Sequence, residues 1–131
     1  MIENQTEAAS NVQLRILVIE DEAVIAMTAE DMIEQLGFVV AGQAASVNDA
    51  LAKVEQCDFD LALLDINLNG VMSTPVAHAL RDAGKQFIFT TGYGSAGSQG
   101  GFDEIKVVAK PYTIATLERA ILQATGDIRR P

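Results

Sequence analysis

The sequence has few of the residues that build covalent or transition-metal sites, with one cysteine, one histidine and no tryptophan in 131 residues. A single cysteine, Cys57, excludes a disulfide framework and a cysteine metal site, and it fits a reducing cytoplasm. With one histidine and one cysteine, transition-metal clusters are excluded as well, and the sequence offers no plausible Ser-His-Asp or Cys-His arrangement. Aromatic residues make up only 5% of the chain, so we expect a mostly aliphatic core.

Positive charge and long apolar runs are also scarce. Nine Lys and Arg stand against 18 Asp and Glu, which gives a formal net charge of −9. Because contacts to nucleic-acid phosphates and anionic lipids need Lys and Arg, this balance argues against nucleic-acid and membrane partners. No stretch approaches the ~20 apolar residues of a membrane span, and residues 1–11 lack the features of a signal peptide. We expect a cytoplasmic protein.

The apolar residues alternate between continuous runs and helical spacing. Continuous runs are typical of parallel strands that are buried on both faces. The alternation predicts an α/β fold with a parallel sheet and right-handed crossovers. We expect a disordered lead-in at 1–12, one domain at 13–125 and a short tail at 126–131. The predicted strands are 14–19, 38–44, 59–65, 87–91 and 105–109, and the predicted helices are 22–36, 47–56, 75–83 and one after Thr113.

The ends of several elements carry recognisable signals. Ser46 and Thr113 are good helix N-caps, and Gly37 is a good helix C-cap. Residues 67–70 read as a turn-rich loop. Between the fourth and fifth strands, where a fourth helix belongs, residues 92–101 contain five glycines, each of which costs a helix about 1 kcal/mol relative to alanine. We expect this fourth helix to be weak or disordered.

Polar side chains follow four of the apolar runs. Glu20 and Asp21 end the first run, Asp65 the third, Thr91 the fourth and Lys110 the fifth. The carboxyl ends of parallel strands meet at one edge of a sheet, where open α/β folds bind ligands. Two carboxylates ~5 Å apart repel by about 3 kcal/mol at an effective dielectric of ~20, and a divalent cation such as Mg²⁺ relieves this. The sequence therefore predicts a magnesium and phosphoryl site.

Asp65 is the candidate nucleophile of this site. A carboxylate can attack a phosphoryl group and form an aspartyl phosphate, a transfer that depends mainly on positioning and charge neutralisation. Lys110 and the Thr91 hydroxyl, with backbone N–H groups from the turns at Asn67 and Gly92, could neutralise and bind the phosphoryl oxygens. Because Pro111 follows Lys110, we hypothesise a cis peptide bond that turns the ammonium inward.

These residues resemble the site of a response-regulator receiver domain of a two-component phosphorelay, over about residues 14–124. The segments 65–70, 75–77 and 87–94 are similar, more narrowly, to the FATGUY group of single-domain response regulators. The resemblance implies a doubly wound, flavodoxin-like five-stranded sheet of order 2-1-3-4-5. It also implies that Asp21, Asp65 and the Asn67 carbonyl bind Mg²⁺ directly, and that Glu20 acts through water.

The function implied by this resemblance is signalling. The protein would accept a phosphoryl group on Asp65 from a histidine kinase of the HWE/HisKA2 type. It would catalyse only its own phosphorylation and dephosphorylation, and would act on a downstream protein or phosphotransfer partner or serve as a phosphate sink. One departure from the family is Val107, where most receivers have an aromatic switch residue. We therefore hypothesise that phosphorylation orders residues 92–101, in place of moving an aromatic switch residue.

Two alternatives belong to other classes. Residues 92–97 match G-x-G-x-x-G, the dinucleotide fingerprint, but they do not follow the first strand and no acidic strand end follows about 20 residues later. A phosphatase with an Asp nucleophile needs a second acid two residues after the first, where this chain has Asn67. Turnover of a phosphate ester would favour the phosphatase, and binding of NAD would favour the nucleotide-binding domain.

Overall fold

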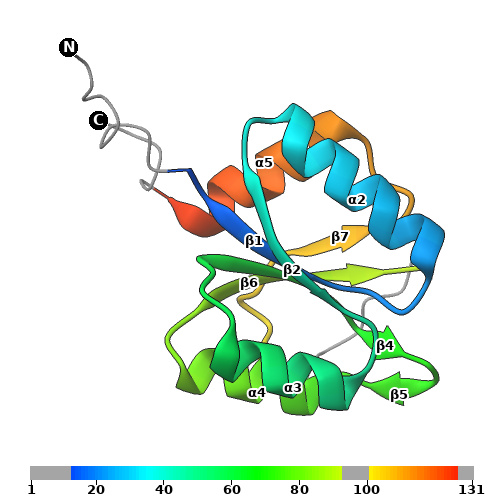
Figure 1. The fold of residues 1–131 in the computed structure, drawn as a ribbon, viewed down its shortest axis with the longest axis vertical. Coiled ribbons are helices and arrows are strands. Elements are labelled where there is room, and N and C mark those ends of the chain that lie inside the picture. Colours follow the sequence, from blue (N-terminus) through cyan, green and yellow to red (C-terminus); the bar gives the residue numbers. More distant parts are fainter. Residues whose placement is uncertain (1–12, 93–100, 127–131) are drawn as a thin grey trace.

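The computed structural model describes residues 13–92 and 101–126 (Figure 1). The predicted lead-in at 1–12, most of the glycine-rich segment 92–101 and the tail from 127 onward lie outside the described residues. The expected weak or disordered fourth helix falls on that segment. None of the helices in the described part of the chain is long and apolar enough to cross a bilayer.

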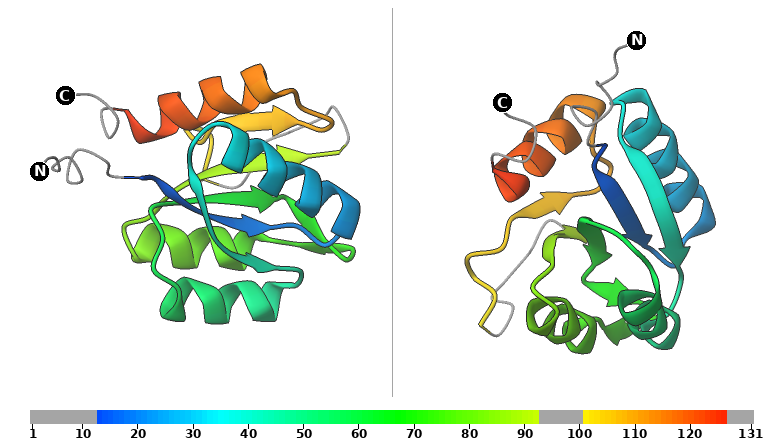
Figure 2. Two further views of the ribbon diagram at one scale, coloured as in Figure 1. Left: turned by 45° about the horizontal axis from the view of Figure 1, so that its top comes forward. Right: turned by 60° about the vertical axis from the view of Figure 1, so that its left-hand side comes forward.

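Five parallel strands form one sheet, and its order β2-β1-β3-β6-β7 equals 2-1-3-4-5 when these strands are numbered along the chain. Helices α2 and α5 cover one face of this sheet, and α3 and α4 cover the other (Figures 1 and 2). The predicted doubly wound α/β fold is confirmed. The strands are β1 (Arg15–Ile19), β2 (Val39–Ala44), β3 (Leu61–Asp65), β6 (Gln86–Thr91) and β7 (Val107–Ala109), and the described helices are α2 (Ala23–Gln35), α3 (Val47–Gln56), α4 (Thr74–Asp82) and α5 (Ile114–Thr125).

The central strands are buried on both faces, as their continuous apolar runs predict. Successive side chains of a strand point to opposite faces, so β1 supplies two cores at once. Leu17 and Ile19 pack toward α3 and α4, and Ile16 and Val18 pack toward α2 and α5. This double burial holds the carboxyl end of β1 in a fixed place between its neighbours.

The predicted helix ends are also present. Ser46 Oγ accepts a hydrogen bond from the Asp49 N–H (3.1 Å), and Thr113 Oγ1 accepts one from the Thr116 N–H (3.1 Å). Gly37 follows α2 with a φ of +87°, a conformation that glycine adopts without strain.

The segment after β3 differs from the prediction. Where the sequence predicts a turn-rich loop at 67–70, residues 67–72 form a two-stranded antiparallel hairpin of β4 (Asn67–Leu68) and β5 (Val71–Met72). Its two turn residues, Asn69 and Gly70, have φ values of +56° and +82°. Asn-Gly with two positive φ values is the preferred two-residue hairpin turn, so the Asn-Gly pair accounts for a hairpin here instead of a loop. Figure 1 shows the hairpin at the end of the sheet where α2 begins.

The core is mostly aliphatic, as expected, but three of the phenylalanines gather at one place. The Phe102 ring lies 5.9 Å from that of Phe87 and 6.1 Å from that of Phe89, both in β6. Two α4 side chains complete the cluster, with the His78 ring at 5.0 Å and the Arg81 guanidinium at 4.1 Å from the Phe102 ring. Phe102 is fully buried, so it anchors the chain ahead of β7.

Candidate functional site

Three of the predicted side chains meet directly at the carboxyl edge of the sheet. Lys110 Nζ donates hydrogen bonds to Glu20 Oε1 (3.0 Å) and Asp65 Oδ2 (2.9 Å), across 90 and 45 residues of the chain. Glu20 follows β1, Asp65 ends β3 and Lys110 follows β7. The parallel arrangement of the strands is what brings these distant residues together.

Asp21 completes an acidic cluster with two of these residues. One carboxylate oxygen from each of Glu20, Asp21 and Asp65 lies within 4.8 Å of the others. Glu20 and Asp65 are buried, and Asp21 is half-buried. All the candidate metal-ligand atoms are hard carboxylate oxygens. Among the described residues, Lys110 is the one ammonium that pairs with these carboxylates. The cluster therefore keeps excess negative charge and fits a small divalent cation such as Mg²⁺.

Burial governs the electrostatics of the cluster. It raises the pKa of Glu20 to about 7, and the nearby charge of Asp65 acts in the same direction. The Glu22 N–H, which donates to Glu20 Oε2 (3.1 Å), and the Lys110 ammonium limit this rise. Burial alone would lower the pKa of Lys110, but its hydrogen bonds to Asp65 and Glu20 raise that pKa above its ordinary value. Lys110 is therefore a permanent cation at the site.

Asp65 is held through both oxygens. Oδ2 accepts from Lys110, and Oδ1 accepts from the backbone N–H of Asn67 (3.1 Å). The side-chain oxygen of Asn67 in turn accepts from the Gly70 N–H (2.8 Å), which closes the hairpin. At the position where a phosphatase with an Asp nucleophile needs its second acid, this chain therefore has an amide whose side chain closes the turn.

Thr91 and Gly92 lie beside Lys110. Thr91 ends β6, pairs with Ala109 of β7 and is buried, and its carbonyl oxygen accepts from the Lys110 N–H (2.7 Å). A Cβ placed on Gly92 would lie 3.6 Å from Lys110 Cε, so Gly92 borders the lysine side chain. The Lys110–Pro111 peptide bond is cis, as hypothesised.

Two residues near the cluster were missed in the sequence. Asn69 donates its backbone N–H to Asp21 Oδ2 (3.1 Å) from the hairpin turn, which the Asn-Gly pair after a strand could have indicated. Tyr112, two residues after Lys110, is half-buried, and burial raises its pKa to about 12, with the charge of Glu20 acting in the same direction. No sequence signal distinguished Tyr112.

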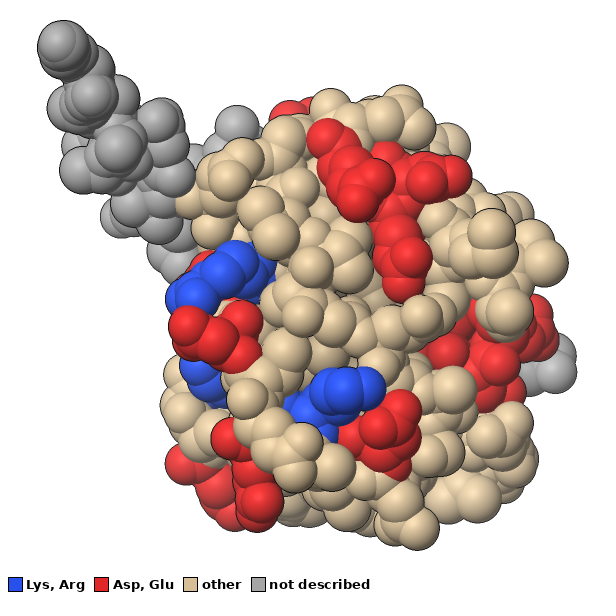
Figure 3. Space-filling view, viewed as in Figure 1, with Lys and Arg blue, Asp and Glu red and all other residues tan. Residues whose placement is uncertain are grey.

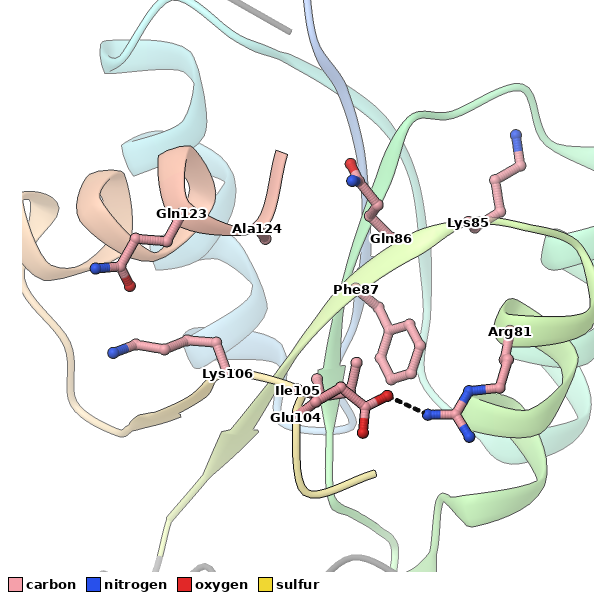
Figure 4. A pocket seen from close by; sticks show the side chains of 9 residues that line it. All are labelled: Arg81, Lys85, Gln86, Phe87, Glu104, Ile105, Lys106, Gln123 and Ala124. Carbon is pink, nitrogen blue, oxygen red and sulfur yellow. Dashed lines mark hydrogen bonds and ion pairs between the residues drawn. The ribbon is translucent and has the colours of Figure 1, made fainter. Parts of the chain in front are cut away.

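A cavity of about 480 Å³ lies elsewhere, at the amino end of β6 (Figure 4). Gln86 and Phe87 line it at the start of the strand, whereas Thr91 ends the strand at the acidic cluster. Figure 4 shows Arg81 and Glu104 paired at one side of this cavity. None of the predicted site residues lines it, so it is separate from the candidate site.

The comparisons with known proteins agree with this geometry. A family model for the response regulator receiver domain matches residues 16–122. The solution structure of SdrG from Sphingomonas melonis Fr1 is 39% identical, covers 83% of this chain and 93% of its own, and has a TM-score of 0.75. The receiver (REC) domain of the PhyR response regulator from Erythrobacter litoralis is 29% identical, with coverages of 86% and 89% and a TM-score of 0.71.

Among curated proteins, the transcriptional regulatory protein PdtaR from Mycobacterium tuberculosis is 32% identical over 63 residues. That segment is 48% of this chain and 31% of PdtaR, so the chain matches less than a third of this relative. The family match, in contrast, extends from β1 into α5 and includes all five strands of the sheet. The chain belongs to the response regulator receiver domain family of two-component systems.

Proposed function

We propose that this protein accepts a phosphoryl group on Asp65 from a phosphohistidine of a histidine kinase, in a reaction that requires Mg²⁺. The observation that carries the proposal is the position of Lys110 Nζ between Glu20 and Asp65, beside a third carboxylate at the same edge of the sheet. A carboxylate nucleophile, a fixed cation and a cluster of oxygen donors are the groups that phosphoryl transfer needs.

In this step an Asp65 carboxylate oxygen attacks phosphorus, so that a P–O bond forms while the P–N bond to imidazole breaks. The electron pair of the broken bond stays on the imidazole nitrogen, which takes up a proton. Lys110 compensates the negative charge of the phosphoryl oxygens, and we assign hydrogen bonds to them from the Thr91 hydroxyl and from backbone N–H groups at Asn67 and Gly92.

We assign the cation to Asp21, Asp65 and the Asn67 backbone carbonyl, with Glu20 acting through water. Bound there, Mg²⁺ supplies positive charge that offsets repulsion between the carboxylates and the phosphoryl oxygens. Glu20 and Asp21 would hold the cation beside Asp65, because they follow the neighbouring strand β1 and one carboxylate oxygen of each lies within 4.8 Å of one from Asp65.

The surface around the site supports a protein partner. Val24 and Met27 of α2 and Val71 and Met72 of β5 are the exposed large hydrophobic residues, each more than half exposed, in the described chain. They lie on the two elements that adjoin Asp21, and exposed apolar groups of this kind favour protein contacts. Figure 3 shows acidic side chains gathered over α2, which has three acidic and no basic residues. We assign this surface to protein partners and not to nucleic acid.

The kinase we propose is of the HWE/HisKA2 type, and the reaction takes place in the cytoplasm. The phosphorylated protein acts either by binding a downstream or phosphotransfer protein or as a phosphate sink. It is a signalling protein that turns over only its own acyl phosphate, with no separate substrate. The half-buried free thiol of Cys57 is compatible with a reducing compartment. The glycine-rich fingerprint of the nucleotide-binding alternative lies largely outside the described residues.

Intact-mass spectrometry after incubation with acetyl phosphate and Mg²⁺ tests the acceptor. We expect one phosphoryl adduct that hydroxylamine removes, and no adduct in Asp65→Asn or when EDTA removes the metal. Asp60→Asn is the matched control, because Asp60 also belongs to the β3 region but pairs with Arg15 at the opposite end of the strand. An adduct that persists in Asp65→Asn would show that the acceptor lies elsewhere.

A further inference from the structure

Asn69 lies at the tip of the β4–β5 hairpin in a left-handed backbone conformation, with a φ of +56°. It is the one non-glycine residue with a positive φ among residues 13–92 and 101–126. Asparagine adopts this conformation more readily than most residues that have a Cβ, whereas alanine is strained there. The geometry of the hairpin tip therefore depends on which residue stands at position 69.

Two hydrogen bonds from Asn69 connect the ends of three strands. Its backbone N–H donates to Asp21 Oδ2 (3.1 Å), and its side-chain Nδ2 donates to the Ala45 carbonyl oxygen (3.2 Å). Asp21 follows β1, Ala45 follows β2 and the hairpin follows β3. These contacts hold the hairpin against the acidic cluster.

Asp21 differs from the other two carboxylates of the cluster in how it is held. Each of the others accepts a hydrogen bond from Lys110 and another from the backbone N–H two residues further along the chain. For Asp21, the Asn69 N–H is the single hydrogen-bond donor within the described part of the chain. Among the described residues, Asn69 is therefore the hydrogen-bond partner that orients Asp21.

We propose that Asn69 is a positioning residue that sets the affinity of the acidic cluster for a divalent cation. Its left-handed backbone directs the N–H at Asp21, and the Ala45 contact holds the hairpin in that position. A ligand carboxylate that is oriented by an outer hydrogen bond binds metal more tightly, and loss of such a partner typically weakens binding ~10–100-fold. This inference rests on the proposed function only in that the cluster binds Mg²⁺.

The test is direct titration of the metal-free protein with Mg²⁺ by calorimetry, without a phosphodonor. We expect Asn69→Ala to raise the dissociation constant about tenfold, because alanine disfavours the left-handed conformation that directs the N–H. Asn69→Gly should stay within about threefold of the wild type, since glycine adopts a positive φ freely and loses only the contact to Ala45. Gln56→Ala is the control, because Gln56 is exposed at the end of α3 farthest from Ala45 and should bind as the wild type does.

Two further measurements separate positioning from damage to the fold. In the absence of metal, amide exchange at Asn69 should be slower in the wild type than in Asp21→Ala, which removes the acceptor. At saturating Mg²⁺ the rate of acetyl phosphate labelling of Asn69→Ala should reach that of the wild type, with only the half-saturating Mg²⁺ concentration raised. A structural defect would instead lower the maximal rate.

Equal Mg²⁺ affinity of Asn69→Ala and the wild type would overturn the proposal. So would an Asn69→Gly variant that binds as weakly as Asn69→Ala, because the backbone conformation would then have no role. Failure of the wild type to bind Mg²⁺ or to form an adduct would instead count against the proposed function, so the two failures are distinguishable.

Discussion

At the scale of single residues, Lys110 is the group that connects the site. Its ammonium is nearly buried, at 10% side-chain exposure, and bridges two buried carboxylates from different strands. Truncating one partner of a buried charged pair leaves the other charge uncompensated. In this cluster the lysine and a divalent cation compensate the same carboxylates, so they are expected to compete.

Replacing Lys110 by alanine should affect labelling and metal binding in opposite directions. Labelling of Asp65 by acetyl phosphate should slow about 100-fold, the usual effect of removing a group that stabilises transition-state charge. Mg²⁺ should bind at least as tightly, because a competing cation is gone. Labelling rates by intact mass and Mg²⁺ titration measure the two effects.

Lys106→Ala is the matched control for this change, because Lys106 lines the separate cavity at the other end of β6. Its labelling rate should equal that of the wild type. Weaker Mg²⁺ binding by Lys110→Ala would mean that the lysine supports the cluster structurally and does not compete with the cation.

At the scale of elements, the contact of Phe102 with β6 and α4 fixes the segment that leads into β7. The ring is 1% exposed and meets both phenylalanines of β6 edge-on, and the Arg81 guanidinium lies over it. β7 itself has only three residues, so it depends on such contacts more than the longer strands do. Because Lys110 immediately follows β7, the packing of Phe102 also helps to hold the Lys110 ammonium in place.

Phe102→Ala should lower the free energy of unfolding by about 3–5 kcal/mol, through lost burial and the cavity that remains. Phe102→Leu keeps much of the side-chain volume, so it should lower the free energy of unfolding markedly less. Urea denaturation followed by circular dichroism measures both variants. A loss below about 1 kcal/mol for Phe102→Ala would contradict the role given to this ring.

At the scale of the whole molecule, ion pairs occupy the end of the sheet opposite the acidic cluster. Arg15, at the start of β1, donates from its side chain to Asp58 and Asp60, and its backbone N–H also donates to Asp60 (2.9 Å). Burial alone would raise the pKa of Asp60, but the hydrogen bonds and charge of Arg15 outweigh it and lower that pKa below its usual value. This pair links β1 to the start of β3 across the sheet.

Asp60 therefore gives the folded protein a pH-dependent share of its stability. A lowered folded pKa means that this share is complete above the usual value near 3.8 and is lost as the pH falls through the lower folded value. Asp60→Asn should be less stable than the wild type by about 1 kcal/mol at pH 7. The difference should shrink as the pH falls below the usual value near 3.8, as measured by urea unfolding. A difference that stays constant from pH 7 down to the lowest pH at which the protein remains folded would contradict this assignment.

Much of the fold and the site could be predicted because the signals are local. A continuous apolar run indicates a strand buried on both faces wherever it lies, and helical spacing with Ser46 or Thr113 ahead of it indicates where a helix begins. Parallel strands that are joined by right-handed crossovers all have their carboxyl ends at the same edge of the sheet. Asp65 and Lys110 could therefore be placed together from sequence, although they lie 45 residues apart.

Contacts that depend on side-chain packing between separate segments were decided by the tertiary structure alone. The Asn69 N–H donates to Asp21, 48 residues away in the chain, and Phe102 packs against β6. Burial in the packed molecule raises the pKa of Glu20 to about 7. Apolar periodicity and turn propensity indicate which side of a single segment is buried. They hold no information about which distant residue contacts that segment. Local sequence patterns therefore define where the strands end and which side chains follow them. Packing defines which neighbours orient these side chains and shift their pKa values.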